Sequence, residues 1–381
     1  MANSVILLFL VTSFLGSETS RIKAEGAFSC DPIPPPAVFV FGDSLSDTGN
    51  YMEAFPFYAD DEDSPYGSIF FHAPSGRFSD GRLIIDFMAS KWGFPFVDPY
   101  FNNIVPNYKH GIDFAVAGAT AGNIAGPVPF FLSLQTYHFG RFKRRVYASL
   151  NSEHKSDCLV SHLPTIEAFK DGIYMIFIGI NDIAVSLFGD NSTTPSDVKE
   201  KTVPSVVSAI SKAVQDLYKE GAKNFMVFNI LAIGCTPSRL VRGSQGPFNS
   251  TDSLGCLQEY NDVVDFANLE LEKSLCNIAK QFKDVSIVVV DLYKFMLDAV
   301  ANPTSNGFKE SEKFKACCGY GGGPYNYSPL VFCGQNPAAK ACSNPREYMS
   351  WDGIHLTDSF SQQFVEEMME GMHYLKPVSE F

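Results

Sequence analysis

Two segments far apart in the chain carry residue types that nucleophilic catalysis requires. Ser44 follows a short apolar run at residues 37–41, and the preceding Gly42 permits a tight turn. A serine hydroxyl becomes a nucleophile at neutral pH when a neighbouring base removes its proton, and histidine is the usual base. Considered alone, Ser44 is equally well interpreted as part of a helix cap, so its assignment depends on partners elsewhere.

One of the seven histidines stands beside an acid that could orient it. Asp352 precedes His355 by three residues, so a single tight turn brings the carboxylate to the imidazole Nδ1. The alternative is a metal site, but no third histidine or acid stands at ligand spacing nearby. We therefore expect neither a metal nor a cofactor. The remaining histidines, without such a partner, are His72, His110, His138, His154, His162 and His373.

Two further segments could stabilise the negative charge that develops when a carbonyl is attacked. Asn181 follows an apolar run at residues 173–178, and its amide could donate to an oxyanion. Gly118 lies in a segment rich in small residues, where its backbone N–H could be another donor. A helix beginning after Ser44 would aim its own N–H groups at the same point. The simpler interpretations are a turn at Asn181 and tight packing around Gly118.

The elements that must position these residues form a regular alternation. Helical spacing from Val206 to Tyr218 ends at Gly221, a second helical pattern runs from about 259 to 282, and Thr357 is a plausible N-cap for a third. Four apolar runs lack polar alternation and therefore predict strands buried on both faces, as in a parallel sheet. They are residues 37–41, 173–178, 225–228 and 286–290. This order predicts a doubly wound α/β sheet covered by helices, in one domain.

The charge of the chain bears on its partners. Its 29 Lys and Arg against 42 Asp and Glu give a formal net charge of -13, with 45% hydrophobic residues. Such a protein is repelled by phosphate backbones and anionic lipid, so we expect no nucleic-acid partner. Solubility alone accounts for the charge.

The N-terminus and the cysteines indicate export. The apolar run from Ser4 to Val11 is too short to span a bilayer, which needs about 20 residues, and it fits a signal peptide over residues 1–26. No later stretch is apolar and long enough for stable membrane insertion. Nine cysteines predict disulfides within an irregular insertion at about 303–345, with at least one thiol left over. Glycosylation sequons occur at Asn191, Asn249 and Asn326.

Together these segments resemble the GDSL esterase/lipase family, in particular its plant branch, over residues 34–372. Residues 41–50 (Phe-Gly-Asp-Ser-Leu-Ser-Asp-Thr-Gly-Asn) are similar to the first family block almost letter for letter. Residues 179–182 match its Gly-x-Asn-Asp block and residues 352–355 its Asp-x-x-His block. The block around Gly118 departs slightly, with alanine where the branch commonly has the first of two glycines. Further plant-like landmarks are residues 76–82, 234–237 and 317–319.

The resemblance implies roles for individual residues. Ser44 would be the nucleophile, His355 the base and Asp352 its orienting acid. The backbone N–H groups of Ser44 and Gly118 and the side chain of Asn181 would form the oxyanion hole. It also implies a flavodoxin-like three-layer α/β/α sandwich with a mostly parallel sheet (the SGNH hydrolase fold), which fits the lack of a Gly-x-Ser-x-Gly elbow.

These observations predict a signal peptide followed by a single catalytic domain at residues 27–381. The expected function is a secreted serine carboxylic-ester hydrolase working through an acyl-enzyme on Ser44, on a small-molecule ester and as a monomer. Its destination would be extracellular or apoplastic, with the vacuole as an alternative. Two other functions stay open: an acyltransferase that passes the acyl group to a small-metabolite alcohol, and a secreted binding or defence protein that has lost catalysis.

Overall fold

The computed structural model of the protein describes residues 34–56, 64–102, 104–122, 126–153, 156–188, 193–244 and 246–378. The predicted signal peptide, Cys30 and the sequon at Asn191 lie outside the described residues. Among the described helices, none is long and apolar enough to cross a membrane.

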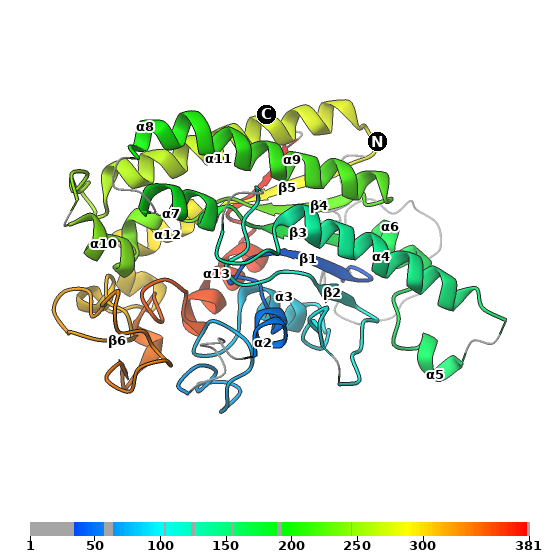
Figure 1. The fold of residues 1–381 in the computed structure, drawn as a ribbon, viewed down its shortest axis with the longest axis horizontal. Coiled ribbons are helices and arrows are strands. Elements are labelled where there is room, and N and C mark those ends of the chain that lie inside the picture. Colours follow the sequence, from blue (N-terminus) through cyan, green and yellow to red (C-terminus); the bar gives the residue numbers. More distant parts are fainter. Residues whose placement is uncertain are drawn as a thin grey trace, which may run out of the picture.

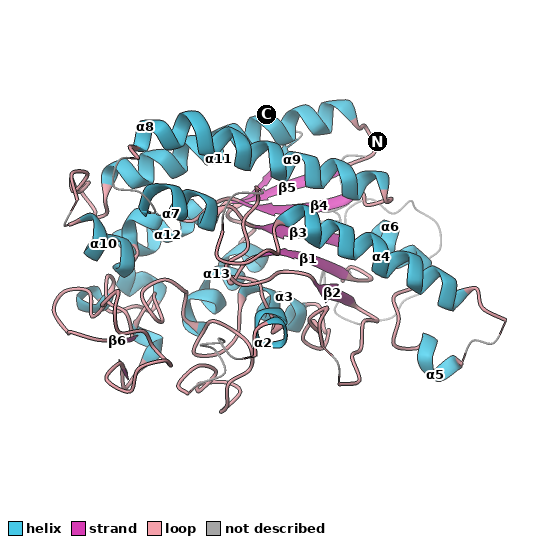
Figure 2. Ribbon diagram, viewed as in Figure 1, coloured by secondary structure: helices cyan, strands magenta, loops and turns pink. Residues whose placement is uncertain are grey.

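A six-stranded sheet runs through the middle of the molecule in the order β2-β1-β3-β4-β5-β8 (Figure 2). The first five strands are parallel, and β8 pairs antiparallel with β5 at the edge. The order of the five parallel strands is that of flavodoxin-like folds, which confirms the predicted mostly parallel sheet. The strands are β1 (Val38–Gly42), β2 (Gly111–Asp113), β3 (Ile173–Phe177), β4 (Asn224–Phe228), β5 (Ser286–Val290) and β8 (Leu375–Pro377).

Both faces of the sheet are covered, which explains why its central strands are continuously apolar. In β1, Phe39 and Phe41 pack into one hydrophobic cluster, whereas Val38 and Val40 pack into another on the opposite face. Helices α4 (Leu132–Leu150), α9 (Val203–Lys219) and α11 (Gln258–Gln281) cover the first face. Helices α3 (Ile84–Lys91), α12 (Leu292–Ala301) and α13 (Asp358–Glu370) cover the second (Figure 1). The result is a three-layer α/β/α sandwich.

The three helices expected from their spacing are present. Helices α9 and α11 include the predicted stretches, and the Thr357 hydroxyl caps α13 by accepting the N–H of Phe360 at 3.1 Å. Strands β2 and β8 and helices α3, α4 and α12 were not predicted. The shorter helices are α2 (Asn50–Ala54), α5 (Asp157–Val160), α6 (Ile166–Asp171), α7 (Ile180–Phe188), α8 (Pro195–Asp197) and α10 (Pro237–Gly243).

Disulfides hold the irregular insertion together, as its cysteine content predicted. Cys317 pairs with Cys342 and Cys318 with Cys333, and a third bridge joins Cys235 to Cys256. The first of these bridges flanks a two-stranded ribbon of β6 (Cys318–Gly319) and β7 (Lys340–Ala341), and the second joins β6 to the segment between the two strands. Two described cysteines, Cys158 and Cys276, remain free thiols.

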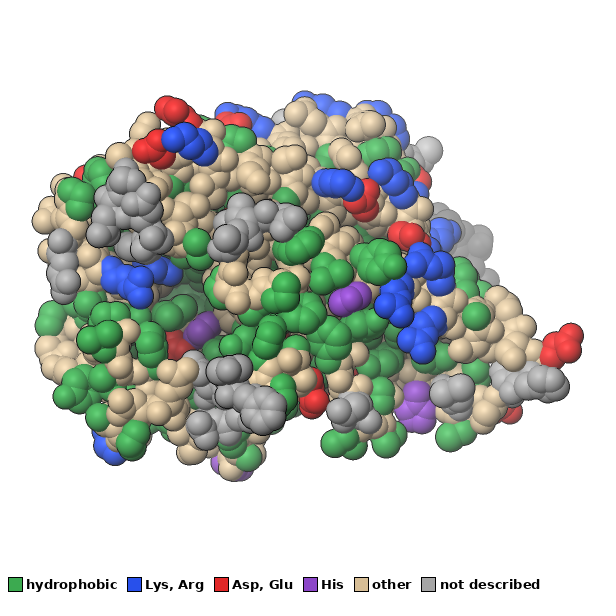
Figure 3. Space-filling model, viewed as in Figure 1, with side chains coloured by type: hydrophobic (Ala, Val, Ile, Leu, Met, Phe, Trp, Pro, Cys, Tyr) green, Lys and Arg blue, Asp and Glu red, His purple; other side chains and the backbone are tan. Residues whose placement is uncertain are grey.

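The charges are unevenly spread over the surface. Although the net charge is -13, the face in Figure 3 carries a group of Lys and Arg side chains over α4. The basic residues of this helix are Arg141, Lys143, Arg144 and Arg145. Hydrophobic side chains form a band across the middle of the same face.

Candidate active site

The candidate residues meet at the edge of the sheet where the order of the parallel strands reverses. Strand β2 lies on one side of β1 and β3 on the other, so the connections leaving β1 and β3 diverge above their carboxyl ends. In open α/β sheets this divergence forms the crevice in which ligands bind. Ser44 follows β1, Asn181 follows β3, and His355 comes from the loop before α13.

Ser44, His355 and Asp352 form one hydrogen-bonded chain. The Oγ of Ser44 lies 2.9 Å from Nε2 of His355, although 311 residues separate them in sequence. The other ring nitrogen, Nδ1, lies 2.6 Å from Oδ2 of Asp352. All three residues are 8–9% exposed, so substrate can reach them while most water is kept away. This arrangement can deprotonate the serine and keep the resulting imidazolium oriented.

A tight turn fixes the acid against its histidine. The second oxygen of Asp352, Oδ1, accepts the backbone N–H groups of Ile354 and His355 at 2.9 and 2.8 Å. Gly353, which lies between Asp352 and Ile354, has a φ of +94°, and a Cβ at this position would lie 2.4 Å from the ring of Tyr327. The turn therefore requires glycine here, which is why Asp-Gly-x-His folds so compactly.

The carboxylate of Asp352 is charged across the ordinary pH range. Burial by itself raises its pKa, but the adjacent His355 and the hydrogen bonds from its ring and backbone outweigh burial, so the pKa falls to about 2. Asp43, next to Ser44, shows the opposite shift. Burial raises the pKa of Asp43 to about 7, against the lowering effects of the Leu45 N–H and of His355.

The expected helix directly after Ser44 is not present, and that prediction was wrong. Residues 43–49 form successive turns, and α2 begins at Asn50. The carboxylate of Asp47 explains this geometry, because it accepts the N–H groups of Gly49 and Asn50 at 2.8 and 2.6 Å. These N–H groups are thus bound within the loop and cannot point at substrate.

The three proposed oxyanion donors lie on adjoining segments. Within the described residues, neither the N–H of Ser44 nor that of Gly118 has a hydrogen-bond acceptor. Asn181, in the first turn of α7, donates one amide hydrogen to the carbonyl of Ala119 at 2.9 Å, which leaves its second hydrogen for another acceptor. Asp47 connects the segments, since its Oδ2 accepts the N–H of Ala117 at 2.7 Å.

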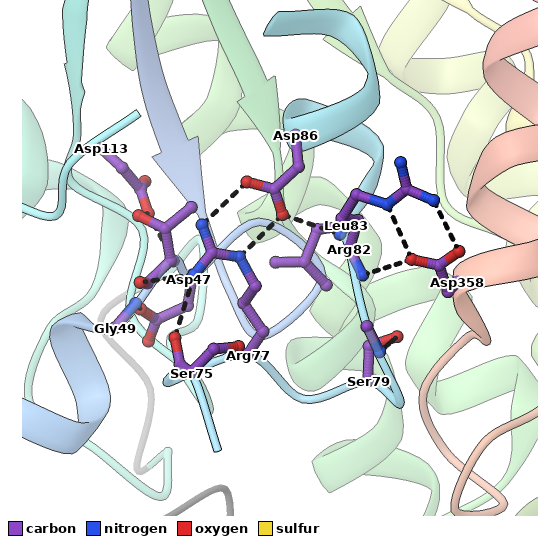
Figure 4. Close-up of polar contacts among 12 residues, drawn as sticks. Asp47, Gly49, Ser75, Arg77, Ser79, Arg82, Leu83, Asp86, Asp113 and Asp358 are labelled. Carbon is purple, nitrogen blue, oxygen red and sulfur yellow. Dashed lines mark hydrogen bonds and ion pairs between the residues drawn. The ribbon is translucent and has the colours of Figure 1, made fainter. Parts of the chain in front are cut away.

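A buried ionic network supports the loop that carries Ser44 (Figure 4). Arg77 forms a bidentate pair with Asp86 at 2.7 and 2.8 Å and donates to the carbonyl of Thr48. Asp113, at the end of β2, accepts both the N–H and the hydroxyl of Thr48. Burial and the neighbouring Asp47 raise the pKa of Asp113 well above its usual value. The loop that carries Ser44 is therefore held from two sides.

A second clamp holds the start of α13, three residues after His355. Arg82 donates to both oxygens of Asp358 at 3.0 and 3.1 Å, as Figure 4 shows. Asp80 accepts the N–H of Asp358 at 2.7 Å. The motif at residues 76–82, noted from sequence only as a family landmark, thus connects to both the serine loop and the histidine loop.

Sequence reasoning missed one residue that contacts Asp352. The hydroxyl of Tyr66 donates to Oδ2 of Asp352 at 2.8 Å, across 286 residues. Tyr66 is 3% exposed, and its ring packs edge-on against Phe78 and Trp351. No local pattern marks this tyrosine, so only the three-dimensional structure identifies it.

The two described sequons differ in accessibility. Asn249 is exposed. Asn326 is half-buried, and its amide donates to the carbonyl of Ala316 at 2.9 Å and accepts the N–H of Gly322. Of the two, Asn249 offers the freer amide for glycosylation.

Comparison with known proteins agrees with these observations. Residues 38–368 match the model of the GDSL-like lipase/acylhydrolase family. A GDSL esterase/lipase of Arabidopsis thaliana, LIP-4, is 34% identical over 347 residues, covering 91% of this chain and 88% of the relative. The Zea mays GDSL esterase/lipase ACHE is 32% identical over 358 residues, covering 90% and 87%. A crystal structure of a putative GDSL-like lipase from Parabacteroides merdae aligns with 13% identity and a TM-score of 0.37, covering 89% of this chain and 96% of that one.

Proposed function

This chain belongs to the GDSL-like lipase/acylhydrolase family and is on that ground an ester-bond hydrolase, and we propose that it works through an acyl-enzyme on Ser44. The observation that carries the proposal is the 2.9 Å approach of His355 Nε2 to Ser44 Oγ, backed by Asp352 at 2.6 Å from Nδ1. This is the constellation that serine acyl transfer requires.

In the first half-reaction Ser44 Oγ bonds to the ester carbonyl carbon while His355 takes the hydroxyl proton. The carbonyl oxygen becomes an oxyanion, which the N–H groups of Ser44 and Gly118 and the second amide hydrogen of Asn181 stabilise. The C–O bond to the alcohol then breaks, and His355 returns the proton to the departing oxygen. The acyl group remains on Ser44 as an ester.

In the second half-reaction water gives a proton to His355 and its oxygen bonds to the acyl carbon. The Ser44 oxygen departs with that proton, and a carboxylic acid is released. Throughout, Asp352 stays ionised, because its pKa of about 2 lies far below the working pH.

We further propose that the protein is secreted after removal of residues 1–26. Three disulfides among the described cysteines support this, since such bonds persist in oxidising compartments. The exposed Asn249 sequon is compatible with passage through the same route. Appearance of the mature N-terminus near Ala27 in the medium of expressing cells tests the proposal, and retention of the full chain inside the cells contradicts it.

The test of the mechanism compares two neighbouring serines. Ser44→Ala should lower kcat for a p-nitrophenyl ester by at least roughly a thousandfold. Ser46→Ala is the matched control, because Ser46 is buried in the same loop and its hydroxyl has no hydrogen-bond partner among the described residues. Unchanged hydrolysis by the Ser44 variant would refute the assignment. Product analysis with and without an added alcohol separates hydrolysis from acyl transfer.

A further inference from the structure

Helix α10 carries two arginines beside the turn that leads to His355. The N–H of Ser238, at the start of α10, donates to the carbonyl of Gly353 at 2.9 Å. Arg239 and Arg242 follow on the same helix, three residues apart and therefore on one face. We call these two residues the arginine pair. Figure 3 shows Lys and Arg side chains beside α10 at the edge of a hollow, with a histidine at its lower edge.

Tyr327 connects the arginine pair to the same turn. Its ring packs so closely on Gly353 that a Cβ there would lie 2.4 Å from it, and its hydroxyl forms a hydrogen bond with Arg242. Burial raises the pKa of Tyr327, the charges of the arginine pair lower it, and the charge of Asp352 raises it. The phenol is thus within electrostatic reach of both guanidinium groups and of the carboxylate that orients His355.

The arginine pair concentrates positive charge at this place. Arg239 is half-buried and Arg242 is exposed, so the pair runs from the interior to the surface. Burial lowers the pKa of Arg239 to about 10, and the neighbouring charge of Arg242 lowers it too. Arg239 therefore keeps its proton at neutral pH. Two like charges held this close repel each other, and an anion bound to both would offset the repulsion.

We propose that the arginine pair binds an acidic group of the substrate, so that the protein prefers esters that also carry a negative charge. This inference rests on the proposed ester hydrolysis at Ser44 and adds the substrate class. Guanidinium groups recognise anionic oxygens through paired, charge-assisted hydrogen bonds. The net charge of -13 works against anions in general, so a preference for acidic esters requires a local positive site.

The first measurement compares acidic esters with uncharged partners of similar size. Mono-p-nitrophenyl adipate against p-nitrophenyl hexanoate places the carboxylate on the acyl side. The compound 4-acetoxyphenylacetate against its amide places the carboxylate on the alcohol side. We expect kcat/KM for at least one acidic ester to exceed that for its partner by roughly tenfold, the effect of one hydrogen-bonded charge. The preferred ester identifies the part of the substrate that the arginine pair binds.

The second measurement assigns the preference to the arginine pair. Arg239→Met and Arg242→Met should each lower the ratio of kcat/KM for the preferred acidic ester to that for its partner by roughly tenfold. Because Arg242 is exposed, its variant keeps the test usable if loss of the half-buried Arg239 impairs folding. Arg141→Met is the matched control, since this exposed arginine lies on α4 and its loss changes the net charge equally. It should keep the wild-type ratio.

The possible results separate this inference from the proposed mechanism. If neither acidic ester is preferred, while Ser44→Ala abolishes hydrolysis of the uncharged esters, the inference is overturned and the mechanism stands. An unchanged ratio in both variants of the arginine pair, or an equal fall in the Arg141 control, also overturns the inference. If Ser44→Ala hydrolyses the uncharged esters as well as the wild type does, the proposed mechanism fails, and this inference fails with it.

Discussion

Tyr66 and Asp352 share a hydrogen bond at the carboxylate oxygen that also faces His355. The tyrosine hydroxyl donates to Oδ2 of Asp352 at 2.8 Å, and Nδ1 of His355 lies 2.6 Å from the same atom. The tyrosine therefore competes with the histidine for the negative charge of one carboxylate oxygen. It can tune the base without touching substrate.

Removing this hydroxyl should change the pH dependence of catalysis. In Tyr66→Phe the carboxylate loses one donor, so its charge stabilises protonated His355 more strongly. We expect the acidic limb of the kcat/KM profile to move to higher pH, and kcat/KM at its plateau to fall by roughly tenfold. Tyr174→Phe is the control, because this buried hydroxyl donates to Phe169 far from the site. A profile unchanged in the Tyr66 variant would refute the tuning role.

The clamp between Arg82 and Asp358 should matter more for catalysis than its exposure suggests. It holds the first residue of α13, so Arg82→Met frees the loop that carries His355. We expect kcat to fall by roughly three- to tenfold with KM little changed, because the hydrogen bonds to a charged group that stabilise this end of α13 by about 1.5–3 kcal/mol reach the reaction only in part, through the position of His355. Steady-state kinetics on a short ester measures this.

Lys91→Met provides the control for that experiment. Lys91, on α3, pairs with Glu370 at the other end of α13, and both side chains are exposed, by 38% and 66%. Such surface pairs contribute about 0–1 kcal/mol, so this variant should retain wild-type kcat. Equal losses in the two variants would mean that general stability of α13, rather than support of His355, is responsible.

Asp43 should make the protein less stable as the pH rises. Its folded-state pKa of about 7 exceeds the ordinary value of 3.8, because burial disfavours the charged form. The folded state therefore binds the proton more tightly, and the stabilisation present below pH 3.8 is lost as the pH rises to about 7. The loss is on the order of a few kcal/mol.

Urea unfolding between pH 4 and 8 measures this dependence. Asp43→Asn carries no titrating group, so its free energy of unfolding should decline less steeply with pH than that of the wild type. The comparison uses the two slopes, because an asparagine amide at the unpartnered Oδ2 position also shifts the absolute stability. Parallel slopes would contradict the assignment. Asp352, with its lowered pKa, affects stability only in acid below this range.

The disulfide between Cys317 and Cys342 should stabilise the histidine loop. The N–H of Cys317 donates to the carbonyl of Ser350 at 3.0 Å, and the N–H of Cys318 donates to that of Trp351 at 2.6 Å. Replacing Cys317 and Cys342 by serine should lower the free energy of unfolding by about 2–4 kcal/mol and reduce kcat/KM. Exchange of the free, exposed Cys158 for serine should change neither. Urea unfolding measures the free energy of unfolding, and kinetics on the same preparations measures kcat/KM.

Sequence patterns predicted the strands that are continuously apolar over four or more residues. The run at 286–290 became β5, and the run at 173–178 became β3, because each is buried on both faces of the sheet. Strand β2 was missed since it has three residues, of which the first is glycine and the last is Asp113. That aspartate is tolerated in the core because Thr48 and Ala115 donate to it, contacts that no local pattern reveals.

In the candidate site, too, local patterns predicted some residues, whereas only long-range contacts identified others. Asp352 and His355 could be paired from sequence because a single turn joins them. Ser44 could be placed near them only through the rule that ligands bind at strand ends, together with the family resemblance. The contacts of Tyr66 and Arg82 could not be predicted from sequence, since each joins residues more than 270 positions apart. Long-range side-chain geometry depends on packing, which periodicity does not encode.

The most direct test of the account is to locate the covalent adduct formed with a fluorophosphonate. The protein is treated with the reagent, ester hydrolysis is followed as it declines, and the modified peptide is identified by mass spectrometry. The account predicts one adduct on Ser44, formed in proportion to the activity lost and absent from Ser44→Ala. An adduct on another residue, or full hydrolysis by protein fully modified at Ser44, would contradict it.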